Sequence, residues 1–212
     1  MTRGRFITFE GIEGVGKSTQ IDRFVAGLER GGVAVLRTRE PGGTPTAERI
    51  RDVVLEHGDE ALPPIAELLL MFAARAVLVE NVIRPTLAEG RWVVADRFVD
   101  ASRAYQGGGR EMPAERVEVL AEWVLDGMVP DCTVLLDAPV EVGLERTRRR
   151  GAQDRLDSET EAFHQRVRAA YLGLARAEPA RFRVVDAQGG VDEVGAAIDT
   201  IVSDLLAEVN QN

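Results

Sequence analysis

The sequence predicts an α/β fold, a three-layer sandwich in which helices flank a mainly parallel sheet of five strands. Short β-prone runs alternate with longer helical patterns along the chain, as parallel strands joined by helical crossovers require. Residues 92–95 and 133–136 are continuously apolar, which is typical of strands covered on both faces. Because the composition does not shift along the 212 residues, we expect a single domain, 1–212.

Local patterns place each element of this fold. Strands are expected at residues 6–9, 33–36, 92–95, 133–136 and 182–185. Helices are expected after the glycine-rich turn that follows the first strand, around residues 50–54, and over 64–89, 113–126, 139–150, 158–178 and 191–208. Helix 64–89 has Pro64 in its first turn, and Pro85 is expected to bend it near its end. Its centre, residues 68–72, is apolar all round, which predicts packing on the sheet or against a partner subunit.

Composition narrows the partners and the compartment. The formal net charge of -9 argues against nucleic acid or an anionic membrane as the main partner, because both attract basic surfaces. No apolar run approaches the roughly 18 residues of a membrane helix, and residues 1–5 lead into a strand instead of a signal peptide. The single cysteine, Cys132, excludes an intrachain disulfide and is expected in the core of a cytoplasmic protein. Both histidines, His57 and His164, are expected at the surface.

A phosphate-binding loop is predicted after the first strand. Residues 11–18 (GIEGVGKS) match the pattern G-x-x-x-x-G-K-[ST] between a predicted strand and a predicted helix. Glycines let backbone N–H groups face phosphate oxygens, and the following helix adds the positive end of its dipole. Lys17 is expected to reach the outer phosphates of ATP and Ser18 to hold Mg²⁺. The expected ATP contacts here are Gly11, Ile12, Glu13, Gly14, Val15, Gly16, Lys17, Ser18 and Thr19.

The lysine count excludes several classes of P-loop protein. Of the 26 lysine and arginine residues, only Lys17 is a lysine. GTPases that recognise guanine through N-K-x-D and partitioning ATPases with a second loop lysine are therefore excluded. Protein kinases are excluded too, because they need a strand lysine and an H-R-D loop. The small-molecule kinases remain.

Two further groups of charged residues have more than one interpretation. Asp96 and Arg97 follow the apolar strand 92–95, at the edge where parallel sheets bind ligands, or they are a helix cap and a solvated arginine. Five arginines, Arg146, Arg148, Arg149, Arg150 and Arg155, fall within ten positions. They form either the solvated end of a helix or a mobile lid that closes over ATP.

Five motifs occur in a characteristic order over nearly the whole chain. They are residues 9–19 (FEGIEGVGKST), 38–44 (TREPGGT), 70–75 (LMFAAR), 96–97 (DR) and 104–110 (AYQGGGR). Together they resemble bacterial thymidylate kinase, a family of P-loop nucleoside monophosphate kinases. The resemblance implies phosphoryl transfer from ATP to dTMP with Mg²⁺, giving ADP and dTDP on the route to dTTP. It also implies a sheet of order 2-3-1-4-5 and a homodimer, and the apolar helix 64–89 is the expected dimer surface.

The resemblance assigns roles on the acceptor side. Phe72 is similar to the residue that stacks on thymine, although its helical spacing alone predicts a core position. Arg75 is similar to the residue that hydrogen-bonds the edge of the base, and Glu13 to the acid that contacts the 3′-hydroxyl. The expected dTMP contacts are Glu13, Phe72, Arg75, Arg97, Ser102, Tyr105 and Gln106. Tyr105 either crowds a ribose 2′-hydroxyl or is buried packing, and the glycines 107–109 are possible loop residues.

The resemblance also places the catalytic charge. Positions 12–15 of the P-loop hold no arginine, unlike some members of the family, which implies the subtype whose lid supplies that charge. The lid is expected at about residues 146–157, with Arg150 as its catalytic arginine and Arg148, Arg149 and Arg155 as further ATP contacts. The other expected catalytic residues are Lys17, Asp96, Arg97 and Glu13, and the expected Mg²⁺ ligands are Ser18 and Asp96. The alternatives are another P-loop pyrimidine nucleotide or nucleoside kinase and a non-enzymatic ATP-binding regulator.

Overall fold

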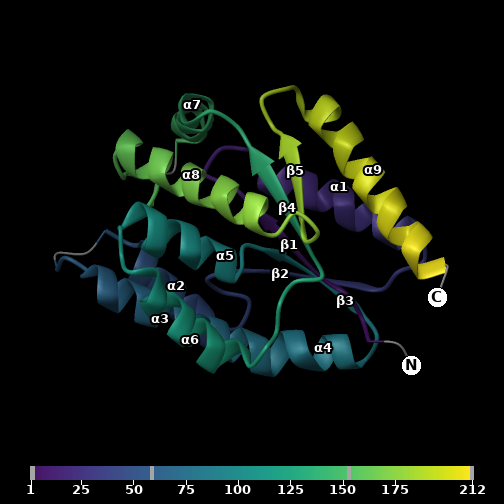
Figure 1. Ribbon diagram of the computed structural model, residues 1–212, viewed down its shortest axis with the longest axis horizontal. Coiled ribbons are helices and arrows are strands. Elements are labelled where there is room, and N and C mark those ends of the chain that lie inside the picture. The colour runs from purple at the N-terminus through teal and green to yellow at the C-terminus, as the bar shows by residue number, and fades with distance from the viewer. Residues whose placement is uncertain (1–2, 58–59, 152–153, 211–212) are drawn as a thin grey trace.

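The protein is a five-stranded parallel sheet covered by helices on both faces (Figure 1). The computed structural model describes residues 3–57, 60–151 and 154–210, without the side chains of Arg150 and Asn210. The strands are β1 Phe6–Glu10, β2 Val35–Arg39, β3 Trp92–Asp96, β4 Cys132–Asp137 and β5 Phe182–Asp186. Their order in the sheet is β2-β3-β1-β4-β5, which confirms the predicted fold and strand order.

The helices follow the predicted alternation closely. The α-helices are α1 Lys17–Arg30, α2 Pro45–Leu55, α3 Pro64–Leu78, α4 Arg84–Ala88, α5 Val99–Ser102, α6 Ala114–Leu125, α7 Val140–Arg150, α8 Glu161–Ala177 and α9 Val191–Asn210. Two π-helical segments, η1 Val79–Ile83 and η2 Arg103–Gly109, complete the described elements. Helices α1 and α9 lie on one side of the sheet, and α2, α3, α4 and α6 lie on the other (Figure 1).

The central strand β1 separates two hydrophobic clusters because its side chains alternate between the two faces of the sheet. Phe9 packs edge-to-face against Phe24 of α1, with 5.1 Å between ring centroids. Phe6 points to the opposite cluster and packs against Phe98 at 4.8 Å. Burial of the whole strand fixes its register, so its carboxyl end holds the P-loop at the edge of the sheet.

The long helix predicted over 64–89 is continuous but not α-helical throughout. The π-helical segment η1 separates α3 from α4. Pro85 has no N–H to donate to the carbonyl of Asn81, and the wider turn before it accommodates the missing hydrogen bond. The structure thus has a π-helical turn just before Pro85, where the sequence predicted a bend.

The glycines at 107–109 are not a flexible loop, because they belong to η2. A Cβ on Gly109 would lie 2.5 Å from a ring carbon of Phe163, and one on Gly108 would lie 2.7 Å from the Cβ of Ala170. Glycine at these positions lets η2 lie directly against α8. The run of glycines marks a close contact between two helical segments.

Several side chains differ from the sequence expectation in their burial. Cys132 is buried, as predicted, and His57 is exposed, as predicted. The prediction for His164 is wrong, because its side chain is 1% exposed and lies on the inner face of α8 beside the P-loop residue Glu13. Strand β2 begins later than predicted because the N–H of Val33 still bonds to the carbonyl of Leu28 at the end of α1.

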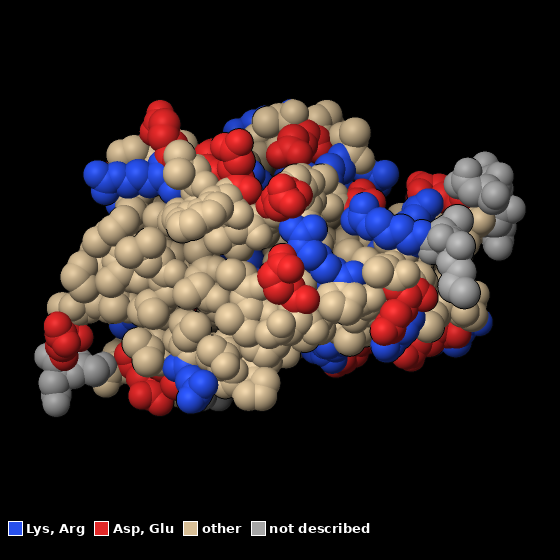
Figure 2. Space-filling model, turned by 90° about the horizontal axis from the view of Figure 1, so that it is seen from below, with Lys and Arg blue, Asp and Glu red and all other residues tan. Residues whose placement is uncertain are grey.

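One outer face of the molecule has few charged side chains. The side of the molecule formed by α3 and α6 shows a wide area without lysine, arginine, aspartate or glutamate (Figure 2). Large apolar side chains are exposed on both helices, namely Ile65, Leu69, Val119 and Trp123. No helix in the described part of the chain is long and apolar enough to cross a membrane.

Candidate nucleotide-binding site

The loop between β1 and α1 adopts a conformation that depends on glycine. Gly11 and Gly14 have φ angles of 136° and 73°, in the region that other residues rarely adopt. A Cβ would lie 2.4 Å from the carbonyl oxygen of Leu136 at Gly11, and 2.0 Å from that of Gly143 at Gly14. The P-loop therefore packs closely against β4 and α7, which leaves no space for a side chain at either glycine.

Lys17, the first residue of α1, reaches back across the loop. Its Nζ donates to the carbonyl oxygens of Gly11 at 3.1 Å and Ile12 at 2.9 Å. Burial lowers the pKa of Lys17 to about 8, and the nearby Arg97 guanidinium lowers it as well. An anionic phosphate next to this amine would favour its charged form.

Arg97 brings together the P-loop and two tyrosines. It follows β3 with a left-handed φ of 73°, which turns its guanidinium back over the end of the sheet. Nη2 donates to Oε1 of Glu13 at 2.9 Å, and Nη1 donates to the Gly11 carbonyl at 3.0 Å and to the Tyr171 hydroxyl at 3.1 Å. The guanidinium also lies 4.8 Å from the centre of the Tyr105 ring. Burial alone would lower the pKa of Arg97, but the neighbouring tyrosines, Glu13 and Asp96 raise it, so the guanidinium stays charged and can pair with a phosphate.

Glu13 is held as a carboxylate by this arrangement. Tyr105 donates its hydroxyl proton to the same Oε1 that accepts from Arg97. Oε2 lies 3.3 Å from Nδ1 of the buried His164. Burial alone would raise the pKa of Glu13, but Arg97, His164 and Lys17 outweigh it and hold the pKa below its usual range. The charged carboxylate at this position is suited to accept a hydrogen bond from a sugar hydroxyl.

Glu10 is a second buried carboxyl group, which the sequence analysis did not single out. It accepts from the N–H of Phe98 at 2.8 Å and from the Tyr171 hydroxyl at 2.6 Å. Burial and the repulsion of Asp100 raise its pKa to about 8. The signal for it was in the sequence, since Glu10 ends a buried strand just as Asp96 does.

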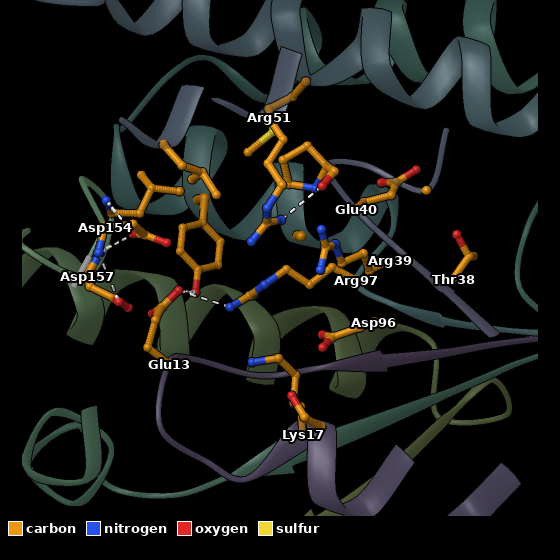
Figure 3. Close-up of a pocket in the computed structure, with 18 of the residues that line it drawn as sticks. Glu13, Lys17, Thr38, Arg39, Glu40, Arg51, Asp96, Arg97, Asp154 and Asp157 are labelled. Atoms are coloured by element: carbon orange, nitrogen blue, oxygen red, sulfur yellow. Dashed lines mark hydrogen bonds and ion pairs between the residues drawn. The ribbon is translucent and has the colours of Figure 1, made fainter. Parts of the chain in front are cut away.

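Glu13, Lys17 and Arg97 line one side of a cavity of about 990 Å³ at the carboxyl edge of the sheet, whereas Glu10 does not line it (Figure 3). Glu13, Lys17, Asp96 and Arg97 face it from the sheet edge and P-loop, while the β2–α2 connection closes another side. Further lining residues come from α2, α3, η1, η2 and the region predicted as the lid. The site therefore combines segments from the first three quarters of the chain.

Arg75 is held in the cavity wall by three hydrogen-bond partners. Its Nε donates to Glu40 at 2.8 Å, Nη1 to Ser102 at 3.1 Å and Nη2 to the Phe98 carbonyl at 3.1 Å. Burial raises the pKa of Glu40, although the charge of Arg75 opposes this effect. Arg75, Ser102 and Tyr105 all line the cavity, as their predicted contact with a nucleotide requires.

Two predicted dTMP contacts lie behind the wall instead of lining it. Phe72 is buried in the same hydrophobic cluster as Phe6 and Phe98. The centre of its ring lies 4.6 Å from Cζ of the Arg75 guanidinium. Gln106 is buried and donates Nε2 to Glu67 at 2.8 Å, while its Oε1 has no hydrogen-bond partner within the described structure. Met71, the neighbour of Phe72, lines the cavity in its place.

Ser18 and Asp96 provide oxygen atoms that suit a magnesium ion. Both line the cavity, and neither side chain has a hydrogen bond or ion pair with any described residue. No group of three or more metal-ligating side chains occurs within the described residues. Mg²⁺ commonly takes one or two protein oxygens and completes its shell with phosphates and water, so this pair fits that ion.

The lid arginines are distributed differently from the prediction. Arg146 lines the cavity and donates to the carbonyls of Ala187 and Gln188 at 2.9 and 3.1 Å. Arg148 and Arg149 are exposed and pair with Glu145, and Arg155 points away from the cavity to Glu67. The side chain of Arg150, the predicted catalytic arginine, lies outside the described residues, as do residues 152 and 153.

Other cavity residues were not singled out from the sequence. Arg39, Glu40 and Arg51 come from the β2–α2 region, where only the motif 38–44 was noted. Asp154 and Asp157 come from the lid region, where the sequence analysis named arginines and no carboxylates (Figure 3). Their positions depend on folding of distant segments onto one another.

Comparison with known proteins agrees with the geometry. A model of the family described as "Thymidylate kinase" matches residues 9–198. The chain belongs to the thymidylate kinase family. It is 52% identical to the thymidylate kinase of Pseudomonas savastanoi pv. phaseolicola, with 96% of this chain and 97% of the relative covered. Identity is 51% to the thymidylate kinase of Methylococcus capsulatus, with 98% and 99% covered. For the thymidylate kinase of Caulobacter vibrioides it is 50%, with 95% and 97% covered.

Proposed function

We propose that this protein transfers the γ-phosphoryl group of ATP to dTMP, forming ADP and dTDP in dTTP biosynthesis. The observation that carries the proposal is the match to thymidylate kinases over nearly the whole chain. The site supports it, since one cavity holds a P-loop lysine, a buried arginine and a carboxylate suited to a sugar hydroxyl.

The chemistry requires charge and alignment more than proton transfer. An oxygen of the dTMP phosphate forms a bond to the γ-phosphorus while the bond from that phosphorus to the β–γ bridging oxygen breaks. A phosphate monoester is largely dianionic near neutral pH, because its second pKa is about 6, so no side chain has to remove a proton from it. Lys17 and the P-loop N–H groups hold the ATP phosphates, and Arg97 directs the acceptor phosphate toward them.

The acceptor nucleoside is proposed to lie between the P-loop acid and α3. Glu13 is assigned to accept from the 3′-hydroxyl, and the Tyr105 ring, held by Glu13 and Arg97, is assigned to crowd a ribose 2′-hydroxyl and so favour deoxynucleotides. The base lies toward Arg75 and Ser102, with Met71 providing an apolar contact. Phe72 supports the base through Arg75 in this arrangement, and a shift of the α3 side chains on binding would be needed for direct stacking.

Magnesium is proposed to bind between Ser18 and Asp96 together with the phosphates. When bound, it neutralises charge that develops on the transferring phosphoryl group. Asp96 would hold the ion at the end of β3, one residue before Arg97. Catalytic charge from the lid is assigned to Arg150, whereas Arg148, Arg149 and Arg155 need a different arrangement to touch ATP.

A homodimer is proposed through the face formed by α3 and α6. Trp123 and Val119 on α6 are 82% and 63% exposed, and Leu69 on α3 is 51% exposed. Apolar area of this kind is typical of an interface. Trp123→Glu should give a monomer in sedimentation experiments, while Val184→Glu, at another exposed valine, should leave a dimer. A wild-type monomer at micromolar concentration would contradict the proposal.

The cytoplasm is the proposed compartment, since ATP and dTMP are found there.

The deciding experiment is an ADP-release assay with purified protein, ATP and Mg²⁺. dTMP, dUMP, dCMP and CMP are each offered as the acceptor, and dTMP is expected to give the highest kcat/KM. Preference for a cytidine nucleotide would favour a different pyrimidine kinase. ATP binding without turnover of any acceptor would indicate a nucleotide-binding regulator instead.

A further inference from the structure

The buried carboxylate of Glu67 lies where four segments meet. Glu67 is on the first turn of α3 and is fully buried. It accepts from Gln106 of η2 at 2.8 Å, from Arg110 at 3.0 Å and from Arg155 of the lid at 2.6 Å. Burial alone would raise its pKa, but Arg110, Gln106 and Arg155 together lower it, so the group is charged. A buried charge with three donors is costly to disturb, because removing the acceptor leaves those donors unpaired.

The lid is attached to the acceptor side of the cavity by these contacts. Nε of Arg155 donates to the carbonyl of Val54 at 2.8 Å, and its backbone N–H donates to that of Leu55 at 3.0 Å. Arg110 extends the network, since its Nη1 lies 2.5 Å from a carboxylate oxygen of Glu159, just beyond the lid. The lid therefore contacts both α2 and α3 through groups that converge on Glu67.

The direction of Arg155 determines what this attachment does. Its neighbours Asp154, Leu156 and Asp157 line the cavity, whereas Arg155 itself points outward to Glu67. Because Arg155 is anchored, the positions of these three lining residues relative to the rest of the cavity wall are fixed as well. Helix α3 also carries Met71 and Arg75, which line the same cavity about one and two turns after Glu67.

We propose that Glu67 is a positioning residue that couples the lid to the acceptor-binding helix α3 through Arg155. In this assignment Arg155 holds the lid in place through its contact with Glu67 and does not bind ATP. Binding of an acceptor against α3 then favours the lid position that covers it. The kinetic consequence rests on the proposed kinase function, but the structural coupling does not.

The first test is hydrogen exchange without nucleotide, using Glu67→Gln, Arg155→Met and the matched control Asp199→Asn. The control removes a two-bond ion pair between Arg23 and Asp199, which joins α1 and α9 away from the lid. Exchange in peptides covering 154–159 should be about tenfold faster in Glu67→Gln and Arg155→Met and unchanged in Asp199→Asn. In the first two variants local opening of this segment no longer has to break the contact between Arg155 and Glu67, so opening costs less free energy. Unchanged lid exchange, or equally faster exchange in α9, would overturn the proposal. If Glu67→Gln does not fold, Arg155→Met decides alone.

The second test is kinetic. Both lid variants should lower kcat with dTMP and ATP by about tenfold, and the double variant should be no worse than either single one, because the two residues act through one contact. Arg155→Lys, which keeps a charge within reach of Glu67, should recover part of the loss. Additive effects of the two substitutions would contradict the coupling. A wild-type protein inactive on dTMP would refute the proposed function and leave the exchange experiment to decide on Glu67.

Discussion

The two sides of the nucleotide cavity are built in different ways. The phosphate side is a continuous segment, residues 11–18, whose shape follows from its glycines and from the strand and helix that flank it. The acceptor and lid side is assembled from α2, α3, η2 and the lid, through side chains such as Glu67 and Arg75 that bridge distant segments. The comparison teaches that local backbone geometry shapes the proposed ATP side of the cavity, whereas long-range ion pairs shape the proposed acceptor side.

The largest expected effect is on the phosphate side. Lys17→Ala should lower kcat by at least about 1000-fold, or roughly 4 kcal/mol of transition-state stabilisation. The fold should survive, because within the described residues the amine donates hydrogen bonds only to two carbonyls of its own loop. Initial rates of ADP release and a thermal melt measure both quantities. Turnover like that of the wild type would remove Lys17 from the mechanism.

Arg150→Ala tests the lid side of the comparison. We expect a loss of about 100-fold in kcat with little change in the KM for dTMP, because a lid charge acts mainly in the transition state. Arg149→Ala, at an exposed residue that pairs with Glu145, is the matched comparison and should have a smaller effect. Equal kcat values for Arg150→Ala and wild type would show that the catalytic charge comes from another residue.

Glu10, the buried last residue of β1, should make the stability of the protein depend on pH. Its pKa is near 4.5 in the unfolded chain and about 8 in the folded protein, so the folded state binds more protons between these values. The free energy of unfolding should therefore fall as pH rises from 4.5 to 8, by at most a few kcal/mol. Glu10→Gln should remove this part of the slope in urea titrations at several pH values. An identical slope in both proteins would show that Glu10 is ionised in the folded state.

The smallest expected effect concerns the packing of η2 on α8. Gly109→Ala should lower the free energy of unfolding by about 1–3 kcal/mol, because the new methyl group would overlap the Phe163 ring. Gly107→Ala is the control, since a Cβ there meets no atom within 4 Å. Urea unfolding of the two variants gives the difference directly. Equal stability would mean that η2 can move away from α8 without cost.

The sequence predicted the fold and the strand, glycine loop and helix of the phosphate side well, because these depend on local patterns. Strand β1, the P-loop and α1 follow from an apolar run, positive-φ glycines and helical spacing, all within about 25 residues. Phe72 shows the limit of the resemblance, since its place behind Arg75 depends on how α3 rotates against the sheet. The burial of His164 could not be predicted from its amino-acid type, because a histidine on an amphipathic helix can face either the core or the solvent. Arg155 belonged to an arginine cluster in sequence, but its partner is 88 residues away.

The solitary lysine has a consequence for chemical labelling. Lys17 carries the only side-chain primary amine in the sequence, and with a pKa of about 8 a measurable share of it is uncharged in mildly basic solution. Uncharged amines react with acylating reagents, so a reagent of this kind would modify one defined side chain in the phosphate site. Occupation of the P-loop by ATP should protect it. The extent of labelling would then report nucleotide occupancy without any engineered residue.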